Sequence, residues 1–403
     1  MTEQLDSLRD ELRTWLTASV PASLYGRPYP MSLEDAEPKD VAADRARYVE
    51  LMAARGFTAP TWPRQYGGAD FTAREARVLQ EELERLRLAP PLLGMGLSMI
   101  GPTLLVHGND AQKSKYLPRI TTGEYRFCQG FSEPGAGSDL AALRTSAVLD
   151  ASGERYIING SKIWTSGAQF ANWMFILVRT DASSKHNGIT FLLVDMRTPG
   201  IEVRPIRLIS GNSMFCEVFF TDVVAQVSDV IGQVNSGWTV AKTLLNFERS
   251  GMGTGSLGGG ARRGVPFGAQ LVRVAKEAIG EQGGKLADGH LRDQLAGVLI
   301  DELAFSLTLE RAAQSRKLSG GPRGEMPVEM SMFKLYQSEL GQRRDELLLM
   351  LRGHAALAWE GGDAADDVAL TRAWLAAKAT TIYGGTSEIQ RNIIAKRVLK
   401  LPQ

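Results

Sequence analysis

The first part of the chain alternates apolar and polar residues with the period of a helix. Apolar side chains recur every three or four residues near the start, which places them on one helix face. These residues are Leu5, Leu8, Leu12, Trp15 and Leu16. A polar, proline-containing stretch over residues 21–39 interrupts the pattern and predicts a long connection. Helical patterns then resume over residues 42–55, 72–88 and 92–107.

From about residue 126 the pattern changes to short β-rich runs separated by turns. The runs are rich in Val, Ile, Phe and Thr, and turn pairs such as Asn159-Gly160 and Pro199-Gly200 punctuate them. Strands are predicted at Arg155–Asn159, Trp173–Val178, Ile189–Met196, Ile201–Pro205 and Cys216–Phe220. This spacing predicts a small sandwich or barrel rather than βαβ units.

After Gly232 the pattern is helical again to the end of the sequence. Helices are predicted at Trp238–Glu248, Ala269–Glu277, Leu291–Leu318, Val328–Leu351, Ala364–Ala377 and Ile389–Leu401. Residues 249–268 are dense in glycine, and each glycine in a helix costs about 0.5–1 kcal/mol relative to alanine. That segment is therefore either a close-packed helix or a broken one. The whole pattern predicts an α+β chain with a helical domain at 1–125, a β domain at 126–231 and a helical domain at 232–403.

Length and charge narrow the class of protein. A chain of 403 residues is long for one hydrophobic core and favours two or three domains. The formal net charge of +1 gives no electrostatic case for binding nucleic acid. No apolar run approaches the roughly 18–20 residues of a membrane span, and the N-terminus lacks the apolar region of a secretion signal. We therefore expect no nucleic-acid partner and no membrane span.

Cysteine and histidine content bears on location and metal binding. The two cysteines, Cys128 and Cys216, argue against a disulfide framework and suit a reducing cytoplasm. The four histidines are scattered without metal-ligand spacing. We expect a cytoplasmic protein without a structural or catalytic metal.

Two short segments of the β region carry candidate chemistry. The glycine-rich loop Gln129–Asp139 can bring its backbone close to a ligand and offer hydroxyls and amides to a polar ring or an anion. The segment Asn159–Gly167 sets Trp164 beside hydroxyl-bearing residues on a predicted strand, which can present an aromatic face to a flat heterocycle. Taken singly, each has a structural alternative. By itself, such a loop is more often a tight turn with an Asp139 cap before Leu140, and such a tryptophan is more often a core residue beside polar turn residues.

Five segments in order carry a resemblance to a known family. They read GFSEPGAGSDLAALRT, NGSKIWTSGAQFANW, GITFLLVDMRTPGIEVRPI, NSGWTVAKTLLNFER and YGGTSEIQRNIIAKRVL, and WPRQYGG precedes them. In their residues and in their order, these segments resemble the motifs of the acyl-CoA dehydrogenase family across nearly the whole chain. The resemblance implies an N-terminal helical domain, a middle β domain and a C-terminal four-helix bundle, with FAD bound between the last two domains.

The resemblance also implies an activity and a set of site residues. The activity is oxidation of an acyl-CoA thioester to the trans-2-enoyl-CoA, with removal of the α-proton and hydride transfer to flavin N5. The residues implied around the isoalloxazine ring are Phe131, Ser132, Trp164 and Ser166. Thr386 and Glu388 are implied to reach the flavin, and Ser138 to line the CoA side.

The catalytic base departs from the commonest family pattern. Most relatives carry a glutamate between the tyrosine and the glycine of the C-terminal signature, but this chain has Gly384, which can offer the thioester only its backbone N–H. A minority, including the isovaleryl-CoA and long-chain acyl-CoA dehydrogenases, carry the glutamate on the helix before the glycine-rich segment, where this chain has Glu248. The resemblance thus implies Glu248 as the base, with Arg249 close to the active site. Burial beside a flavin would raise the pKa of Glu248 toward neutrality.

Contacts to the far half of FAD are irregular in this sequence. Relatives commonly carry an arginine three residues before a Phe-Gly pair, but here Gly264 holds that position and Arg263 lies one residue further away. The usual Gln-x-x-Gly-Gly has no clean counterpart in residues 349–354. One hypothesis is that a second, related subunit supplies these contacts, and the alternative is a homodimer or homotetramer with altered contacts.

Three functions are compatible with the sequence. The leading one is an FAD-dependent acyl-CoA dehydrogenase that passes electrons to an electron-transfer flavoprotein. The resemblance is to bacterial members acting on bulky or dicarboxylic acyl-CoAs such as pimeloyl-CoA or steroid-degradation intermediates. The alternatives are a flavin monooxygenase on the same fold and a non-catalytic partner subunit. Glu248 argues against the monooxygenase, and the cluster of Phe131, Ser132 and Trp164 argues against the non-catalytic subunit.

Overall fold

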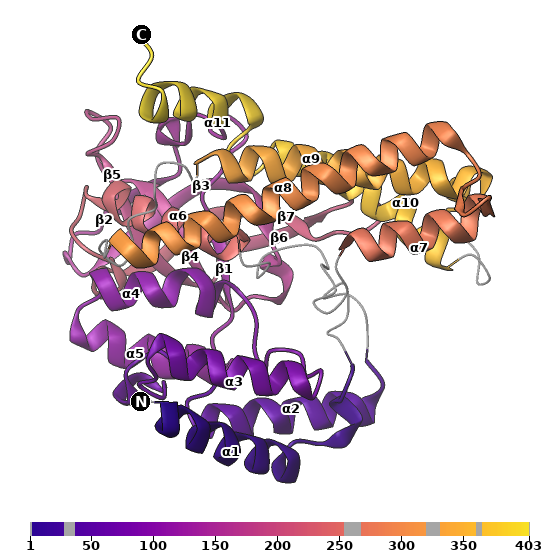
Figure 1. Cartoon of the computed structure of the whole chain (residues 1–403). Helices are drawn as coiled ribbons and strands as arrows, with labels where there is room; N and C mark the ends of the chain where they lie inside the picture. The colour runs from indigo at the N-terminus through magenta and orange to yellow at the C-terminus, as the bar shows by residue number, and fades with distance from the viewer. Residues whose placement is uncertain (1, 28–36, 254–266, 320–330, 360–364, 403) are drawn as a thin grey trace. The chain divides into compact units, whose positions relative to one another are not determined.

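The computed structural model describes residues 2–27, 37–253, 267–319, 331–359 and 365–402 (Figure 1). The chain divides into two compact units. Unit 1 comprises Met1–Ile206 and Met214–Glu248, and unit 2 comprises Arg207–Ser213 and Arg249–Gln403. No helix in the described ranges is long and apolar enough to cross a membrane.

Unit 1 begins with a layer of helices. They are α1 (Thr2–Ser19), α2 (Lys39–Ala54), α3 (Ala73–Arg85), a π-helical turn at Gly96–Ile100 that continues into α4 (Gly101–His107), and α5 (Asp110–Thr121). Capping boxes at Thr72 and Asn109 begin α3 and α5 by satisfying backbone N–H groups that the helix leaves free. Apolar faces of α1, α2 and α3 form one core, which includes Leu12, Leu16 and Tyr48. The amphipathic pattern of the first residues is thus confirmed as α1.

The predicted helix at 92–107 begins later in the structure. Pro90 and Pro91 precede this segment, and Gly94 has a φ of 128°, a conformation that a right-handed helix does not contain. Helical structure therefore starts only at Gly96, with the π-helical turn, and α-helix follows from Gly101.

The β region of unit 1 forms one seven-stranded mixed sheet. Its strands are β1 (Phe127–Gly130), β2 (Ser146–Leu149), β3 (Arg155–Ser166), β4 (Trp173–Arg179), β5 (Ile189–Asp195), β6 (Ile201–Ile206) and β7 (Phe215–Gln226). The path runs β1-β4-β2-β3-β7-β6, with β5 also paired to β4. The predicted strands are all present, while β1 and β2 were not predicted. Both are four-residue strands: β1 pairs in parallel with the distant β4, whereas β2 pairs antiparallel with β3 along its length and in parallel with β4 at Ser146.

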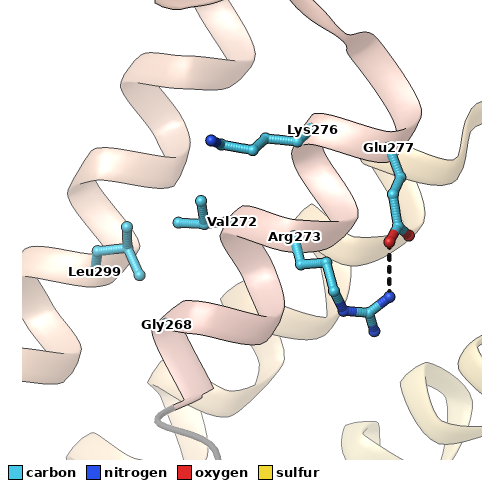
Figure 2. Close-up of a pocket in the computed structure, with 6 residues that line it drawn as sticks. All are labelled: Gly268, Val272, Arg273, Lys276, Glu277 and Leu299. Carbon is cyan, nitrogen blue, oxygen red and sulfur yellow. Dashed lines mark hydrogen bonds and ion pairs between the residues drawn. The ribbon is translucent and has the colours of Figure 1, made fainter.

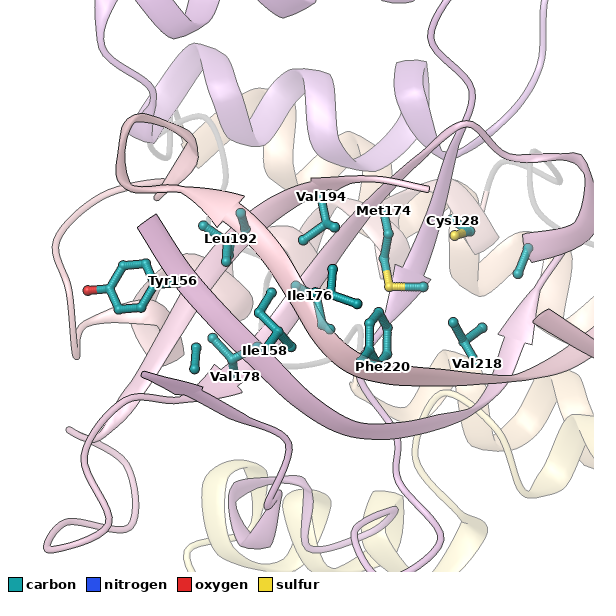
Figure 3. Close-up of a cluster of buried hydrophobic side chains, with 14 of the residues drawn as sticks. Cys128, Tyr156, Ile158, Met174, Ile176, Val178, Leu192, Val194, Val218 and Phe220 are labelled. Atoms are coloured by element: carbon teal, nitrogen blue, oxygen red, sulfur yellow. The ribbon is translucent and has the colours of Figure 1, made fainter. Parts of the chain in front are cut away.

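The inner face of this sheet is a closely packed apolar core (Figure 3). Ile158 of β3, Ile176 of β4 and Val218 of β7 are fully buried within it. Strands β4 and β5 are buried on both faces, which explains why their sequences read as continuous apolar runs. This core gives β3 a rigid base, and β3 carries Trp164 and Ser166.

Helix α6 (Gly237–Gly253) follows the sheet, and a helical bundle makes up most of unit 2. Its helices are α7 (Phe267–Ile279), α8 (Gly289–Ser319), α9 (Ser331–Arg352) and α10 (Ala365–Ala377), and they run side by side in Figure 1. The two-residue strands β8 (Glu281–Gln282) and β9 (Lys285–Leu286) form a hairpin between α7 and α8. Leu271, Leu295 and Leu347 belong to the shared core of the bundle. Helix α11 (Ser387–Ile393) continues into a π-helical turn at Ile394–Val398.

Part of the glycine-rich segment lies outside the described residues. The interpretation of residues 254–266 as a close-packed or broken helix therefore stays a prediction, as does the displaced Arg263. Gly251 and Gly253 belong to the last turns of α6.

Candidate active site

A bulge in β3 turns Trp164 out of the sheet. The pairing of β3 with β7 shifts register between Lys162 and Thr165, so two residues of β3, Ile163 and Trp164, oppose one residue of the partner strand. Trp164 has a φ of 60°, which is strained for a residue other than glycine, and its side chain is 55% exposed. Its ring meets the Phe215 ring edge to face at 6.2 Å between centroids. A large aromatic face is therefore held open on a rigid strand.

The segment that follows β1 lies directly beside this bulge. The backbone N–H of Ile163, the residue before Trp164, donates to the Ser132 carbonyl at 2.9 Å. The resemblance implies that Phe131 lies beside the isoalloxazine ring, but the Phe131 ring is buried in the core. Its side chain is only 4% exposed and packs edge to face against Phe175 and Phe191 in the core. Phe131 thus presents its main chain rather than its ring, and Ser132 is the half-buried hydroxyl next to it.

The tip of the glycine-rich loop is exposed and is held by charges. Asp139 makes a 2.8 Å ion pair with Lys185, and Ser138 beside it is exposed. The interpretation of Asp139 as a helix cap is wrong. It precedes the short helical turn Leu140–Ala142 without a capping hydrogen bond from its side chain, because the carboxylate is directed to Lys185 instead.

In unit 2 the C-terminal signature forms a tight turn before α11. Gly384 and Gly385 have φ values of 64° and 92°, which side-chain-bearing residues rarely adopt. The Gln390 side chain donates to the Gly384 carbonyl at 3.1 Å, and the Lys334 ammonium donates to the Gly385 carbonyl at 2.6 Å. Both carbonyls of the turn are therefore fixed by side chains from helices.

Thr386 and Glu388 begin helix α11. The Thr386 hydroxyl accepts the N–H of Ile389 as an N-cap, at 3.3 Å. Hydrogen bonds from its own backbone amide and from the Thr386 side chain hold the pKa of Glu388 below its usual value. Both residues thus lie in the first turn of α11, where the backbone N–H groups of a helix favour a bound anion or carbonyl.

Helix α6 carries the predicted base. The backbone of Glu248 and Arg249 is helical, but the side chains of residues 248–253 lie outside the described part of the structure. Leu244, one turn before Glu248, is fully buried. The catalytic role of Glu248 and the active-site position of Arg249 stay predictions.

Two buried hydroxyls next to predicted site residues lack a hydrogen-bond partner within their own units. Five buried side-chain polar atoms in the described residues lack a hydrogen-bond partner, and Thr165 Oγ1 and Ser387 Oγ are two of them. Thr165 lies between Trp164 and Ser166, and Ser387 follows Thr386. A buried polar group without a partner costs about 1–3 kcal/mol, so native structures keep few of them. Both hydroxyls are enclosed by their own unit, so it is the open Trp164 face of unit 1, with the half-buried Ser132 beside it, that fits a planar, polar ligand such as a flavin.

A groove in unit 2 lies apart from the predicted residues (Figure 2). It has a volume of about 470 Å³ and is lined by residues of α7 and α8, among them Gly268, Val272 and Leu299. Arg273 and Glu277 at its edge neutralise each other in a 2.8 Å ion pair. None of the predicted site residues whose side chains the structure describes lines it, so the groove adds nothing to the candidate active site.

Comparison with known proteins decides the family. Three models match successive parts of the chain: the N-terminal domain of acyl-CoA dehydrogenase over residues 2–124, the middle domain over 128–223 and the C-terminal domain over 235–399. The chain belongs to the acyl-CoA dehydrogenase family. The expected fold of helical, β and helical parts is confirmed, as is the expected class of enzyme, an acyl-CoA dehydrogenase. The family consists of flavoenzymes, and this acyl-CoA dehydrogenase carries the β3 bulge and the signature turn described above.

Similar proteins cover most or all of the chain. The acyl-CoA dehydrogenase IpdE1 of Mycobacterium tuberculosis is 34% identical over 100% of this chain and 99% of its own length. The acyl-CoA dehydrogenase FadE34 of the same organism is 36% identical over 87% of this chain and 46% of its own length. Among solved structures, the Tcur3481-Tcur3483 steroid acyl-CoA dehydrogenase is 27% identical, with a TM-score of 0.73 over 100% of this chain and 98% of that one. The ChsE4-ChsE5 complex from Mycobacterium tuberculosis is 29% identical, with a TM-score of 0.73 over 100% and 99%.

Proposed function

We propose that this acyl-CoA dehydrogenase binds FAD and desaturates an acyl-CoA thioester between Cα and Cβ, with Glu248 as the base. The observation that carries the flavin part of the proposal is the exposed Trp164 on the β3 bulge, whose preceding residue Ile163 is hydrogen-bonded to the Ser132 carbonyl. The proposed contacts of the isoalloxazine ring are Phe131, Ser132, Trp164 and Ser166, and Thr386 and Glu388 of the C-terminal signature are proposed to reach the flavin as well. When bound, FAD supplies the hydride acceptor of the reaction.

Two groups of this chain act on the substrate in the proposal. A thioester α-proton is weakly acidic, so its removal needs a placed base, which contributes typically about 10²–10⁴-fold. Glu248 fills that role, because the base position of the signature is occupied by Gly384. The Gly384 backbone N–H is proposed to stabilise the enolate oxygen, and one such donor contributes about 2.7–4 kcal/mol. Ser138 lines the CoA side, and Arg249 lies next to the base.

We further propose that the substrate is a bulky or dicarboxylic acyl-CoA. The name of one solved relative, a steroid acyl-CoA dehydrogenase, supports the idea of a steroid-derived thioester. An electron-transfer flavoprotein is the proposed acceptor of the electrons.

The proposed assembly is an oligomer in which a second, related subunit supplies contacts to the far half of FAD. Two solved relatives carry paired names, Tcur3481-Tcur3483 and the ChsE4-ChsE5 complex, which supports such a partner. In the matching region of this chain, Arg352 is occupied by an ion pair with Asp367. The Arg352 side chain is therefore already paired within its own unit. Co-expression with a related subunit that changes neither flavin content nor assembly would contradict the partner.

The visible spectrum of the purified chain tests the flavin and the substrate class together. We expect a flavin spectrum, from the chain alone or from its complex with a related subunit, that bleaches anaerobically when one thioester of an acyl-CoA panel is added. The thioester that bleaches it names the substrate class. A protein that stays colourless in both forms would refute the proposal.

Replacement of the proposed base tests the mechanism. In Glu248→Gln we expect turnover to fall at least about 10²-fold, the lower range of a general base, while the flavin spectrum is retained. The matched control is Glu277→Gln, an exposed helix glutamate paired with Arg273, which should leave turnover unchanged. Near-normal reduction of a dye acceptor by Glu248→Gln would show that the base is a different residue.

A further inference from the structure

A fully buried lysine, Lys162, lies two residues before Trp164 on β3. Lys162 on β3 has no exposed surface, and Glu133 in the glycine-rich loop is 9% exposed. Neither residue was predicted from the sequence to belong to the site. Moving two charges out of water costs several kcal/mol for each ion, and the mutual attraction of the pair often fails to recover this cost. A pair kept at such a cost needs a reason other than the stability of the sheet.

The pair joins the two segments that carry the proposed flavin contacts. The Lys162 ammonium lies 2.8 Å from Glu133 Oε1 and donates to the Phe131 carbonyl at 3.2 Å. The next residue, Ile163, donates its backbone N–H to the Ser132 carbonyl at 2.9 Å. Lys162 and Ile163 therefore hold the main chain of Phe131 and Ser132 immediately before the strand bulges out at Trp164.

Glu133 extends this connection to the other end of the loop. Its carboxylate accepts the backbone N–H groups of Arg144 at 2.7 Å and Thr145 at 2.9 Å. The Arg179 guanidinium donates to the carbonyls of Ala141 and Leu143 in the same stretch. The start of the glycine-rich loop and the residues that follow it, 141–145, are thus hydrogen-bonded to the sheet or to Glu133, while Ser138 in the loop stays exposed.

The surroundings of the pair keep both side chains charged and in contact with each other. Burial works against the charged form of Glu133, but Lys162 and the hydrogen bonds at Thr145 and Arg144 hold its pKa below the usual value. Burial lowers the pKa of Lys162 to about 8, although Glu133 opposes this change. At neutral pH both side chains are therefore charged, and the ammonium has donors directed at Glu133 and at Phe131.

We propose that the Lys162–Glu133 pair is a positioning element for FAD, which fixes the Phe131–Ser132 main chain against the Trp164 face. The inference rests on the proposed flavin role of these residues. Lys162 and Glu133 act through the residues they hold, and the fold of the sheet does not depend on their charges. The apolar core on the inner face of the sheet, with Ile158, Ile176 and Val218, stabilises the strands independently of the pair.

The test separates positioning from stability. The main variant is the double replacement Lys162→Met with Glu133→Gln, which removes both charges at similar side-chain volume and leaves no unpaired buried ion. The single variant Lys162→Met provides a second measurement, because the carboxylate keeps its two backbone donors. The control is Lys115→Met, which breaks another ion pair of unit 1, the 2.8 Å pair with Asp229. All variants are made in the assembly that carries flavin.

Three readouts decide the outcome: the FAD dissociation constant, the shape of the oxidised flavin spectrum and the melting temperature after FAD removal. For the double variant we expect a rise of about tenfold or more in the dissociation constant, equivalent to about 1.4 kcal/mol of binding. The bound spectrum should shift toward that of free FAD, while the melting temperature stays near that of the wild type. Lys115→Met should leave FAD affinity and the spectrum unchanged.

The opposite pattern overturns the proposal. If both Lys162 variants lower the melting temperature but leave the dissociation constant and spectrum of the folded protein as in the wild type, the pair has only a structural role. A double variant that does not fold also overturns it, since the fold would then depend on the charges. A wild-type assembly without flavin would refute the proposed function itself, whereas equal FAD binding by wild type and double variant refutes only this inference.

Discussion

Replacement of Gly385 by alanine should damage the signature turn in a measurable way. At φ 92° a side-chain-bearing residue is strained, which costs about 1–2 kcal/mol. The added Cβ would also meet Gln390 Nε2 at 2.5 Å. Gln390 is 3% exposed, so displacing it from the Gly384 carbonyl leaves buried polar groups unpaired, at about 1–3 kcal/mol.

These contributions add to about 3 kcal/mol of destabilisation in unit 2. For a domain of this size each kcal/mol lowers the melting temperature by about 2–4 °C, so we expect a fall of roughly 6–12 °C. Gly284→Ala is the matched control, because Gly284 has a φ of 74° but a Cβ there meets nothing within 4 Å. The control should be destabilised only by the backbone strain of about 1–2 kcal/mol. Turnover should fall at least about tenfold in Gly385→Ala, since the neighbouring Gly384 is proposed to contact the thioester, and remain normal in the control.

Thermal unfolding by circular dichroism and steady-state turnover measure both effects on the same preparations. Equal melting temperatures for the two variants would show that Gln390 yields without cost, which contradicts the steric part of the reasoning. Unchanged turnover in Gly385→Ala would contradict the proposed role of the turn in catalysis.

Three further predictions concern other parts of the molecule. Trp164→Ala should weaken FAD binding by about 1–3 kcal/mol, the range for an aromatic side chain stacked on a nucleic-acid base. The melting temperature should change little, because Trp164 is 55% exposed. Fluorescence titration with FAD measures the affinity, and an unchanged affinity would contradict the proposed contact between Trp164 and the flavin. Lys334→Met should remove the hydrogen bond to the Gly385 carbonyl and lower turnover without loss of flavin, as a spectrum and a turnover assay would show; normal turnover would mean that Gln390 alone holds the turn. Hydrogen bonding to Arg13 and Arg85 lowers the pKa of Glu82 from 4.5 to about 2, against the effect of burial. Because the folded-state pKa is the lower one, this stabilisation is present above pH 4.5 and is lost as the pH falls toward 2. Wild type should therefore lose more stability than Glu82→Gln over that interval, and parallel melting curves of the two proteins against pH would contradict the prediction.

Local signals in the sequence predicted most of the secondary structure. The three- and four-residue spacing of Leu5 to Leu16 predicted α1, and the apolar runs predicted β4 and β5. Helix α5 was not predicted, although Asn109 followed by Gln112 is a capping-box pair that could have revealed its start. The short strands β1 and β2 could not be found in this way, because four residues carry little periodicity, and the partner of β1, β4, is distant in the sequence.

The site illustrates the same division. The order of the five motifs identified the family, and the strand carrying Trp164 was predicted and is present as β3. The alternation of β3 placed Tyr156, Ile158 and Lys162 on one face, so the burial of Lys162 had a signal in the sequence. Its partner Glu133 had none, because residues separated by a loop and a hairpin come together only when the sheet forms.

The sequence by itself determined most of the helical and β segments, the family and the absence of a glutamate at position 384, since these depend on neighbouring residues or on residue identity. Only the tertiary structure decided that the Trp164 face opens outward at a bulge while the Phe131 ring turns into the core. It also decided that Lys162 holds the Phe131 carbonyl and Lys334 holds the Gly385 carbonyl. The physical reason is that strand register and the direction of a side chain follow from long-range packing, which minimises buried unpaired groups across the whole unit rather than within one segment.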